Sequence, residues 1–300
     1  MAISALLLET KRFAVHDGPG IRTAFFTKGC SLKCIWCHNP ESTSFQPQTG
    51  FFPALCRNCG RCTALCEAQQ MKENSHLFLS SFCTACGRCE ELCPGGAMKL
   101  YGKTVTVDEA FALALEDRDF YETSGGGVTV SGGEPLMQKE FTLALFEKLK
   151  KEKIHTALDT CAFVPRSTLE EALAVTDMFL VDFKHADSEM HRRLTGQSND
   201  LIKSNLEFLS SQDARIEIRI PFVPGCNDSR ENMERTGEFL GKLNIGCVKL
   251  LPYHALARNK YAALQMPDTM PAADSPTEEM IGDAVEILQK YGLDARSGRA

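Results

Sequence analysis

The chain has 300 residues, 43% of them apolar, and a formal net charge of −6 with His taken as neutral. This length suffices for one large α/β barrel or for two domains with a sizeable core. The acidic balance argues against a nucleic acid partner bound through a general basic field. Fourteen Cys leave a choice between disulfides and metal sites.

The N-terminal segment lacks the pattern of a secretion signal. No charged region precedes the short apolar run 3–8, because Lys11 and Arg12 follow it. No stretch of the sequence reaches membrane-spanning length, so we expect a cytoplasmic protein with no membrane contact. Disulfides are rare in a reducing compartment, which favours a metal or redox cofactor as the role of the Cys.

The first feature along the chain is a three-Cys loop. Residues 3–9 and 21–27 are predicted as short strands, and Cys30, Cys34 and Cys37 follow the second in a C-x3-C-x2-C pattern. A 4Fe-4S cube takes one ligand per iron, so three Cys leave one iron open. That iron could bind a small molecule that offers an amine and a carboxylate. A three-Cys zinc site and buried free thiols are the alternatives.

Residues 45–103 contain an internal repeat of Cys-rich runs with a period of 27 residues. The spacing is the bacterial ferredoxin pattern, in which the fourth Cys of each run ligates the cluster held mainly by the other run. A pair of zinc sites is less favoured, because zinc modules usually pair two C-x2-C knuckles across a longer gap. We therefore assign one cluster to Cys56, Cys59, Cys62 and Cys93, and the other to Cys83, Cys86, Cys89 and Cys66.

After the repeat, strands alternate with helices, which is typical of a parallel sheet or barrel. Asp108 is predicted to cap a helix over about 109–121, and a capping box at 275–278 to begin a final helix that stops at Gly292. The predicted strands cover 128–130, 154–158, 178–181, 216–220 and 248–251.

Each predicted strand ends in a polar or glycine-rich cluster, and ligands bind at that edge of parallel sheets and barrels. Gly132 and Gly133 would let backbone approach a ligand closely, and Glu134 could accept hydrogen bonds from an ammonium group. Asp159 and Asp182 could bind a cation or ribose hydroxyls. Glycines are also common in tight turns, and surface Asp is common at strand ends, so none of these residues alone indicates a ligand site. Their joint placement on one face with the Cys loop favours one.

In order along nearly the whole chain, these motifs resemble the glycyl-radical enzyme activating enzymes, relatives of the pyruvate formate-lyase activating enzyme within the radical S-adenosylmethionine superfamily. The matching segments are His16–Arg22, the Cys loop with 38–42, Ser124–Pro135, Asp159–Thr160, Asp182–Lys184, Val223–Gly225 and Leu250–His254. The resemblance implies an α/β fold, a partial (β/α)6 TIM-like barrel. Residues 1–44 would begin the barrel, 45–103 would form a bacterial-ferredoxin-like insert with two 4Fe-4S clusters, and 104–300 would complete the barrel.

The resemblance also implies roles for single residues. Cys30, Cys34 and Cys37 would hold a 4Fe-4S cluster whose open iron chelates S-adenosylmethionine. A monovalent cation would bind beside the ligand carboxylate at Asp159, Thr160, Asp182 and the Leu180 carbonyl. The other ligand contacts would be Gly132, Gly133 and Glu134 at the amino group, with Lys184, Arg219 and His254 around the rest, and Asp17 would border an incoming peptide.

By this resemblance the protein is an oxidoreductase that cleaves S-adenosylmethionine reductively. The 5′-deoxyadenosyl radical would take a hydrogen atom from a backbone glycine of a partner glycyl-radical enzyme, with flavodoxin or ferredoxin as electron donor, and the protein would be a monomer. The subgroup with two extra clusters typically activates decarboxylases, dehydratases and choline lyase rather than pyruvate formate-lyase.

Two other functions compete with this interpretation. The first is a radical S-adenosylmethionine enzyme that acts on a small molecule or peptide. It is disfavoured because the segments 16–22 and 124–135 occur together, a combination associated with the activating enzymes. A plain electron-transfer protein would need the cluster Cys. It would not account for the rest of the chain, in which each predicted strand ends in polar residues. The remaining Cys161, Cys226 and Cys247 are isolated beside apolar residues, so we interpret them as structural. Cys161 directly follows Asp159 and Thr160, which leaves a role near the ligand open.

Overall fold

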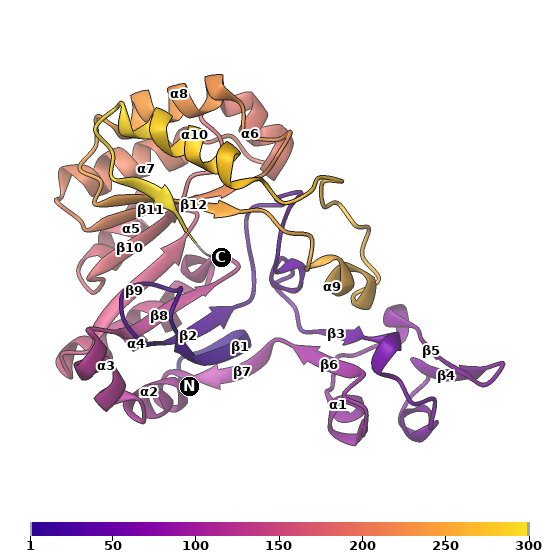
Figure 1. Cartoon of the computed structure of the whole chain (residues 1–300). Coiled ribbons are helices and arrows are strands. Elements are labelled where there is room, and N and C mark those ends of the chain that lie inside the picture. The colour runs from indigo at the N-terminus through magenta and orange to yellow at the C-terminus, as the bar shows by residue number, and fades with distance from the viewer. Residues whose placement is uncertain (1, 299–300) are drawn as a thin grey trace.

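The computed structural model describes residues 2–298 and is built around a twisted nine-stranded sheet (Figure 1). The strand order is β13-β12-β11-β10-β9-β8-β2-β1-β7. The seven strands from β13 to β2 run parallel, whereas β1 and β7 add antiparallel strands at one edge. The strands are β1 (Ser4–Ala14), β2 (Arg22–Thr27), β7 (Lys103–Thr106), β8 (Gly127–Gly132), β9 (His155–Thr160), β10 (Met178–Asp182), β11 (Ile216–Phe222), β12 (Cys247–Pro252) and β13 (Ala295–Ser297).

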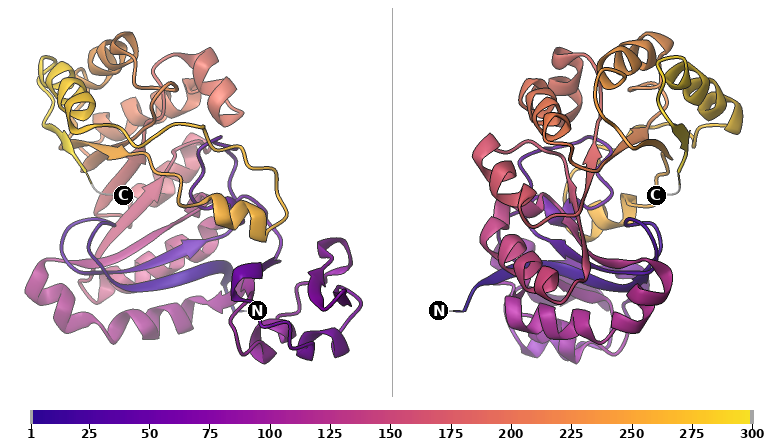
Figure 2. Two further views of the ribbon diagram at one scale, coloured as in Figure 1. Left: turned by 45° about the vertical axis from the view of Figure 1, so that its right-hand side comes forward. Right: turned by 90° about the vertical axis from the view of Figure 1, so that its left-hand side faces the viewer.

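The helices that connect the parallel strands form a layer against the sheet (Figure 2). Neighbouring helices pack side by side in this layer, α2 on α4, α4 on α5, α5 on α7, and α8 on α10. Among the residues described, no helix has the length and apolar character that crossing a bilayer requires. The helices are α2 (Val107–Leu115), α3 (Arg118–Ser124), α4 (Lys139–Lys151), α5 (Arg166–Leu173), α6 (Ser188–Thr195), α7 (Asp200–Ser211), α8 (Arg230–Leu240), α9 (Arg258–Ala263) and α10 (Glu278–Gln289).

Alternation along the strands separates the core from the functional side of the sheet. Successive side chains of a strand point to opposite faces. In β8, Val128 and Val130 are fully buried in the main hydrophobic core, whereas Ser131 lines a cavity on the other face. The central parallel sheet that the sequence predicted is therefore confirmed, and its second face carries polar groups.

The first helix after the repeat differs from the prediction. Thr106, not Asp108, is the N-cap, because its hydroxyl accepts from the Glu109 N–H (3.2 Å) and the Glu109 carboxylate accepts in return from the Thr106 N–H (2.8 Å). The predicted single helix over 109–121 is two helices, α2 and α3, since the chain turns at Asp117.

The last helix also begins later than predicted. The hydroxyl of Thr277 accepts from the Met280 N–H (3.2 Å), so Thr277 is the N-cap and α10 starts at Glu278. Ser275 lies before the helix. Gly292, with φ of +79°, follows the end of α10 closely, as predicted.

The Cys-rich segment lies to one side of the sheet and has its own small elements (Figure 1). A buried cluster that includes Phe51, Phe78, Cys89 and Met98 holds it together. Lys103 already belongs to β7 of the large sheet. The elements are the antiparallel pairs β3 (Gln48–Phe51) with β6 (Met98–Tyr101) and β4 (Gln69–Lys72) with β5 (Ser75–Phe78), and the short helix α1 (Arg88–Leu92).

The glycine run before β8 permits a close backbone crossing. A Cβ at Gly126 would lie 1.8 Å from the Ile21 carbonyl oxygen. We expect Gly126→Ala to lower the free energy of unfolding by about 3 kcal/mol or more, the upper end for overpacking, because backbone must move. Gly125→Asn is the control, since Gly125 has φ of +68° and no atom within 4 Å of a Cβ. Urea unfolding measures both, and equal stability of the two variants would contradict the prediction.

Candidate active site

The three Cys of the loop after β2 line one cavity at the carboxyl-terminal edge of the parallel strands. The cavity has a volume of about 800 Å³. The ends of β8, β9, β10, β11 and β12 border the same space. The strand-end residues that line it are Ser131, Gly132, Gly133, Asp159, Asp182, Lys184, Arg219 and His254.

Backbone hydrogen bonds fix the Cys loop against the end of α6. The Lys33 N–H donates to the Thr195 carbonyl (2.7 Å), and the Ile35 N–H donates to the Leu194 carbonyl (3.0 Å). Trp36 is buried in an apolar cluster with other aromatic side chains. The loop conformation therefore depends on an element about 160 residues further along the chain, which spacing alone does not reveal.

A second anchor of the loop is the short helix α9. Lys260 Nζ donates to the His38 carbonyl (3.0 Å), to Asn39 Oδ1 (2.9 Å) and to Glu41 Oε1 (2.7 Å). The Tyr261 hydroxyl donates to the carbonyl of Cys37 (3.1 Å). These contacts hold the segment after the third Cys in place.

The three thiols fit a cluster better than a single ion. Burial raises the pKa of Cys34 to about 11 and that of Cys37 to about 12, so these groups become thiolates only beside a strong positive charge such as iron. Within residues 2–298, no three Cys, His, Asp or Glu side chains converge on one ion. A 4Fe-4S cube takes its ligands on different irons, and three Cys around one cavity match that requirement.

The part of the cavity wall next to the Cys loop is bare backbone at Gly132 and Gly133. A Cβ at Gly132 would lie 2.2 Å from the Thr27 amide nitrogen, and one at Gly133 would lie 2.3 Å from the Gly29 carbonyl oxygen. Gly132 has φ of +122°, which side chains rarely adopt. Both glycines are thus required by close packing against the start of the Cys loop, and they also leave room for a ligand.

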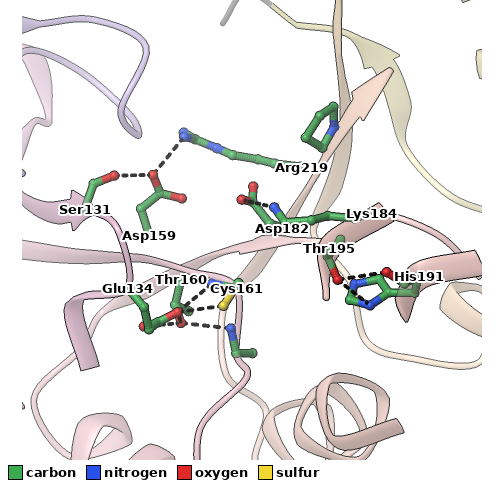
Figure 3. A network of polar contacts seen from close by, with 12 residues as sticks. Ser131, Glu134, Asp159, Thr160, Cys161, Asp182, Lys184, His191, Thr195 and Arg219 are labelled. Carbon is green, nitrogen blue, oxygen red and sulfur yellow. Dashed lines mark hydrogen bonds and ion pairs between the residues drawn. The ribbon is translucent and has the colours of Figure 1, made fainter. Parts of the chain in front are cut away.

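Charged groups from three strands form the floor of the cavity (Figure 3). Lys184 Nζ pairs with Asp182 (2.7 Å), and Arg219 lies 3.7 Å from Asp159, which also accepts from the Ser131 hydroxyl (2.6 Å). Burial raises the pKa of Asp159 to about 6, and repulsion from Asp182 adds to this while Arg219 opposes it. Burial is the largest single effect on Lys184 and disfavours its charge, but attraction to Asp182, to Cys34 and to Cys161 together outweighs burial and raises the pKa of the amine.

Glu134 does not reach the cavity as the sequence suggested. Its carboxylate is fully buried and accepts from the Thr160 hydroxyl (2.8 Å), the Cys161 N–H (2.9 Å) and the Leu136 N–H (3.1 Å) (Figure 3). The Thr160 hydroxyl is therefore committed to Glu134 and turned away from Asp159 and Asp182. In this structure a cation between Asp159 and Asp182 would therefore not have the Thr160 hydroxyl as a ligand.

We expect Glu134→Gln to destabilise the end of β9. The amide would place an N–H₂ group among hydroxyl, backbone and thiol donors, and an unpaired buried donor costs about 1–3 kcal/mol. Thermal unfolding should show this loss. The control Glu189→Gln changes an exposed residue in the first turn of α6 and should have little effect; equal unfolding temperatures for both variants would contradict the role of Glu134.

His254 meets the residue that follows the last Cys of the loop. The imidazole rings of His38 and His254 stack with centroids 4.2 Å apart, and both line the cavity. Burial lowers the pKa of His38 to about 4, so this ring is neutral at pH 7. The sequence predicted His254 at the site and missed His38.

The turn before β2 closes the cavity from the side of the N-terminus. Arg219 Nη2 donates to the His16 carbonyl (2.9 Å), and the Thr129 hydroxyl donates to the Asp17 carbonyl (2.6 Å). Arg22 is fully buried and donates to the Pro19 carbonyl (3.1 Å) and to Thr129 Oγ1 (2.6 Å). The turn is thereby held by its backbone, with Asp17 at the cavity wall.

Comparison with known proteins agrees with this arrangement. The model of the radical SAM superfamily matches residues 25–239. The (2S)-3-sulfopropanediol dehydratase activating enzyme of Klebsiella oxytoca is 39% identical over 88% of this chain and 87% of its own. The trans-4-hydroxy-L-proline dehydratase activating enzyme of Clostridioides difficile is 38% identical over 99% of this chain and 100% of its own.

The chain belongs to the glycyl-radical enzyme activating enzymes of the radical SAM superfamily. A solved domain of a pyruvate-formate lyase-activating enzyme from Bacteroides vulgatus is 32% identical, with a TM-score of 0.50, over 58% of this chain and 99% of that domain. The family resemblance expected from the sequence is confirmed, and with it a 4Fe-4S cluster, S-adenosylmethionine and the activation of a glycyl-radical enzyme.

In this activating enzyme one of the two groups of four Cys assigned from the spacing lies around one cavity of the insert. Cys56, Cys59, Cys62 and Cys93 border one small cavity, although Cys93 comes from the second run. A hydrogen bond with Arg88 lowers the pKa of the Cys86 thiol, and the charge of Cys66 acts on the same guanidinium. Chain crossing of this kind matches the exchange of the fourth ligand in the ferredoxin pattern.

One of the three remaining Cys of the activating enzyme is not isolated. Cys161 is buried at the cavity, which Cys30 also lines, and its thiol donates to Glu134 (3.0 Å). The structure thus places Cys161 beside the site, the alternative that its position after Asp159 and Thr160 had left open. Cys247 is buried and contacts Arg296 (3.2 Å), and Cys226 is half-buried, both outside the cavity.

Proposed function

We propose that Cys30, Cys34 and Cys37 ligate the site cluster of this activating enzyme and that S-adenosylmethionine occupies the cavity between the Cys loop and the strand ends. The observation that carries the proposal is that the three thiols, the bare glycine wall and the Asp182–Lys184 pair border one space. When bound, the cluster supplies the electron for reductive cleavage of the sulfonium and, on its open iron, a site for the amine and carboxylate of the ligand.

The residues of the chain then have separable tasks in binding. Gly132 and Gly133 offer backbone to the amino group, since the Glu134 carboxylate is fully occupied by donors of the chain. Lys184 and Arg219 supply positive charge near the ligand carboxylate. His254 and Asp159 lie where the ribose and adenine can be bound, and a monovalent cation would be held by Asp159 and Asp182.

Hydrogen abstraction needs exclusion of water and close placement of the partner glycine. The 5′-deoxyadenosyl radical reacts with any nearby C–H bond, so the cavity walls must keep the target within contact distance. The 16–20 turn, held by Arg22, Thr129 and Arg219, forms the wall that a glycine loop of a partner would meet. The chain positions the reactants, while the cofactors carry the chemistry.

We propose that the insert holds two further 4Fe-4S clusters that pass electrons from flavodoxin or ferredoxin to the site cluster. The ferredoxin spacing of the eight insert Cys and the shared cavity of Cys56, Cys59, Cys62 and Cys93 support this. The protein would act as a monomer in the cytoplasm. Its partner would be a dehydratase or lyase of the glycyl-radical class, since the names of the relatives give such enzymes as their partners.

A panel of candidate glycyl-radical enzymes tests the proposed function. The reconstituted protein is mixed anaerobically with S-adenosylmethionine, a reductant and each candidate, and glycyl radical is measured by electron paramagnetic resonance. At least one dehydratase or lyase should give a radical that depends on S-adenosylmethionine. Release of 5′-deoxyadenosine without a radical on any glycyl-radical enzyme would contradict the function.

Iron content tests the number of clusters. We expect about twelve irons per chain, as three cubes require, in the wild type and in the Cys161→Ala/Cys226→Ala/Cys247→Ala variant. Metal analysis with acid-labile sulfide measures this. A loss of about four irons from the variant would show that one of these Cys is a ligand.

A further inference from the structure

The two Cys-rich runs repeat in sequence, but the contacts of their sulfur atoms differ. The matching backbone contacts are alike, with the Asn58 N–H 3.4 Å from Cys56 Sγ and the Ala85 N–H 3.3 Å from Cys83 Sγ. The third Cys of the first run has a further neighbour. His76 Nε2 lies 3.4 Å from Cys62 Sγ. In the part of the chain that the structure describes, no His makes the corresponding contact with Cys89 of the second run.

The His76 ring is fixed by its surroundings. It packs edge-on against Phe51, with centroids 4.6 Å apart. Gln69, which is 3% exposed, places Oε1 2.7 Å from His76 Nε2. His76 pairs with Met71 and Gln69 with Phe78 in the β4–β5 hairpin, so Gln69 and His76 are diagonal neighbours and the hairpin backbone sets their spacing.

Ligation of Cys62 decides which ring nitrogen of His76 carries the hydrogen. A thiolate that ligates iron can only accept, so Nε2, 3.4 Å from Cys62 Sγ, would be the donor, and the amide oxygen of Gln69 would accept from the same N–H. Nδ1 is buried and has no partner among residues 2–298. The imidazole therefore directs its single N–H toward a sulfur that also borders the four-Cys cavity.

Hydrogen bonds to ligand sulfurs tune the reduction potential of an iron-sulfur cluster. Reduction adds one electron, and the added negative charge is stabilised by an N–H that points at the sulfur. A donor of this kind raises the potential relative to the same cluster without it. Backbone donors reach both groups of sulfurs, from Asn58 and Ala97 to Cys56 and Cys93 of one group and from Ala85 to Cys83 of the other, and His76 adds a side-chain donor at Cys62.

We propose that His76 is a positioning residue that raises the reduction potential of the cluster on Cys56, Cys59, Cys62 and Cys93, and that Gln69 aims its ring. The inference rests on the proposed insert clusters. It makes the two insert clusters unequal in potential despite their identical ligand spacing.

The chain offers a matched control at the other cluster. Thr49 Oγ1 lies 3.4 Å from Cys83 Sγ, and Thr49 is buried. Thr49→Val removes this hydroxyl at nearly unchanged volume. It should alter the potential of the cluster on Cys83, Cys86, Cys89 and Cys66 and leave the cluster beside His76 unchanged.

The test is a redox titration of the full-length reconstituted protein followed by electron paramagnetic resonance. Cys59→Ala and Cys86→Ala assign the signals, because each removes one insert cluster. His76→Phe should shift the midpoint of the cluster that contains Cys62 to a more negative value, with a change of about tenfold in its reduction equilibrium, or about 59 mV for one electron. His76→Gln keeps an N–H donor and should recover part of the shift.

Three results would overturn the inference. They are an unchanged Cys62-cluster midpoint in His76→Phe with iron content intact, an equal shift of both insert clusters, and a His76→Gln midpoint as low as that of His76→Phe. Four irons per wild-type chain would instead reject the insert clusters themselves, and this inference with them. Iron analysis before titration separates the two failures.

Discussion

Cys34→Ala should abolish cleavage of S-adenosylmethionine with every reductant. Cys34 lies in the middle of the loop that lines the cavity, and in the proposed ligation it is one of three thiols that hold a cube which needs all of them. Loss of this thiol leaves the cluster without the geometry that presents its open iron. Release of 5′-deoxyadenosine, measured by chromatography with dithionite and separately with flavodoxin, should fall to the level without enzyme.

Cys226→Ala is the matched control for this variant. Cys226 is a half-buried thiol that does not line the cavity, so its loss should leave cleavage intact. Circular dichroism should show both variants folded. Cleavage at the wild-type rate in Cys34→Ala would mean that the loop does not hold the site cluster.

Changing Cys59 and Cys86 together to Ala should separate electron delivery from chemistry. Both thiols are exposed in the insert and away from the cavity, so S-adenosylmethionine should still bind. A cluster held by four Cys has no open iron, so it can pass electrons but cannot bind the substrate. Loss of both insert clusters should interrupt electron delivery, and cleavage driven by flavodoxin or ferredoxin should therefore fall by about tenfold or more. Dithionite, which can reach the site cluster directly, should restore part of the activity.

The control for the insert is Ser81→Ala, which changes an exposed residue before Cys83 and removes no ligand. It should keep the flavodoxin-driven rate. If the Cys59→Ala/Cys86→Ala variant also kept that rate, the insert would be a docking or structural module and not a relay.

The strand ends of the site were predictable because the sequence marks them. Apolar runs of β9 and β10 end directly in Asp159 and Asp182, and parallel strands bring their carboxyl ends to one edge. The structure places both Asp, together with Lys184 and Arg219, on that edge. Periodicity and motif order therefore suffice to place residues that belong to long regular strands.

Residues that act through distant partners were not predictable. Lys260 belongs to a six-residue helix and reaches the Cys loop across more than 200 residues of chain. Arg22 belongs to a strand predicted from the sequence, but the sequence does not show that its side chain is buried beneath the 16–20 turn. Glu134 follows two glycines that do reach the cavity, yet the turn directs its carboxylate into the protein. Such outcomes depend on tertiary contacts that local patterns do not encode.

The helix starts show the same limit at short range. Asp108 and Ser275 are good N-cap residues, but Thr106 and Thr277 cap the helices instead. A few neighbouring Ser, Thr and Asp compete for each cap, and the packing of the following helix decides among them.

The most direct test of the account is the transfer of a glycine hydrogen. A partner glycyl-radical enzyme is produced with glycine deuterated at the α-carbon, and the partner that forms a radical in the panel is used. Mass spectrometry of the 5′-deoxyadenosine released by the wild-type protein should show incorporation of one deuterium, in step with radical formation on the partner. Unlabelled 5′-deoxyadenosine accompanying full radical formation would contradict direct abstraction from the glycine by the 5′-deoxyadenosyl radical.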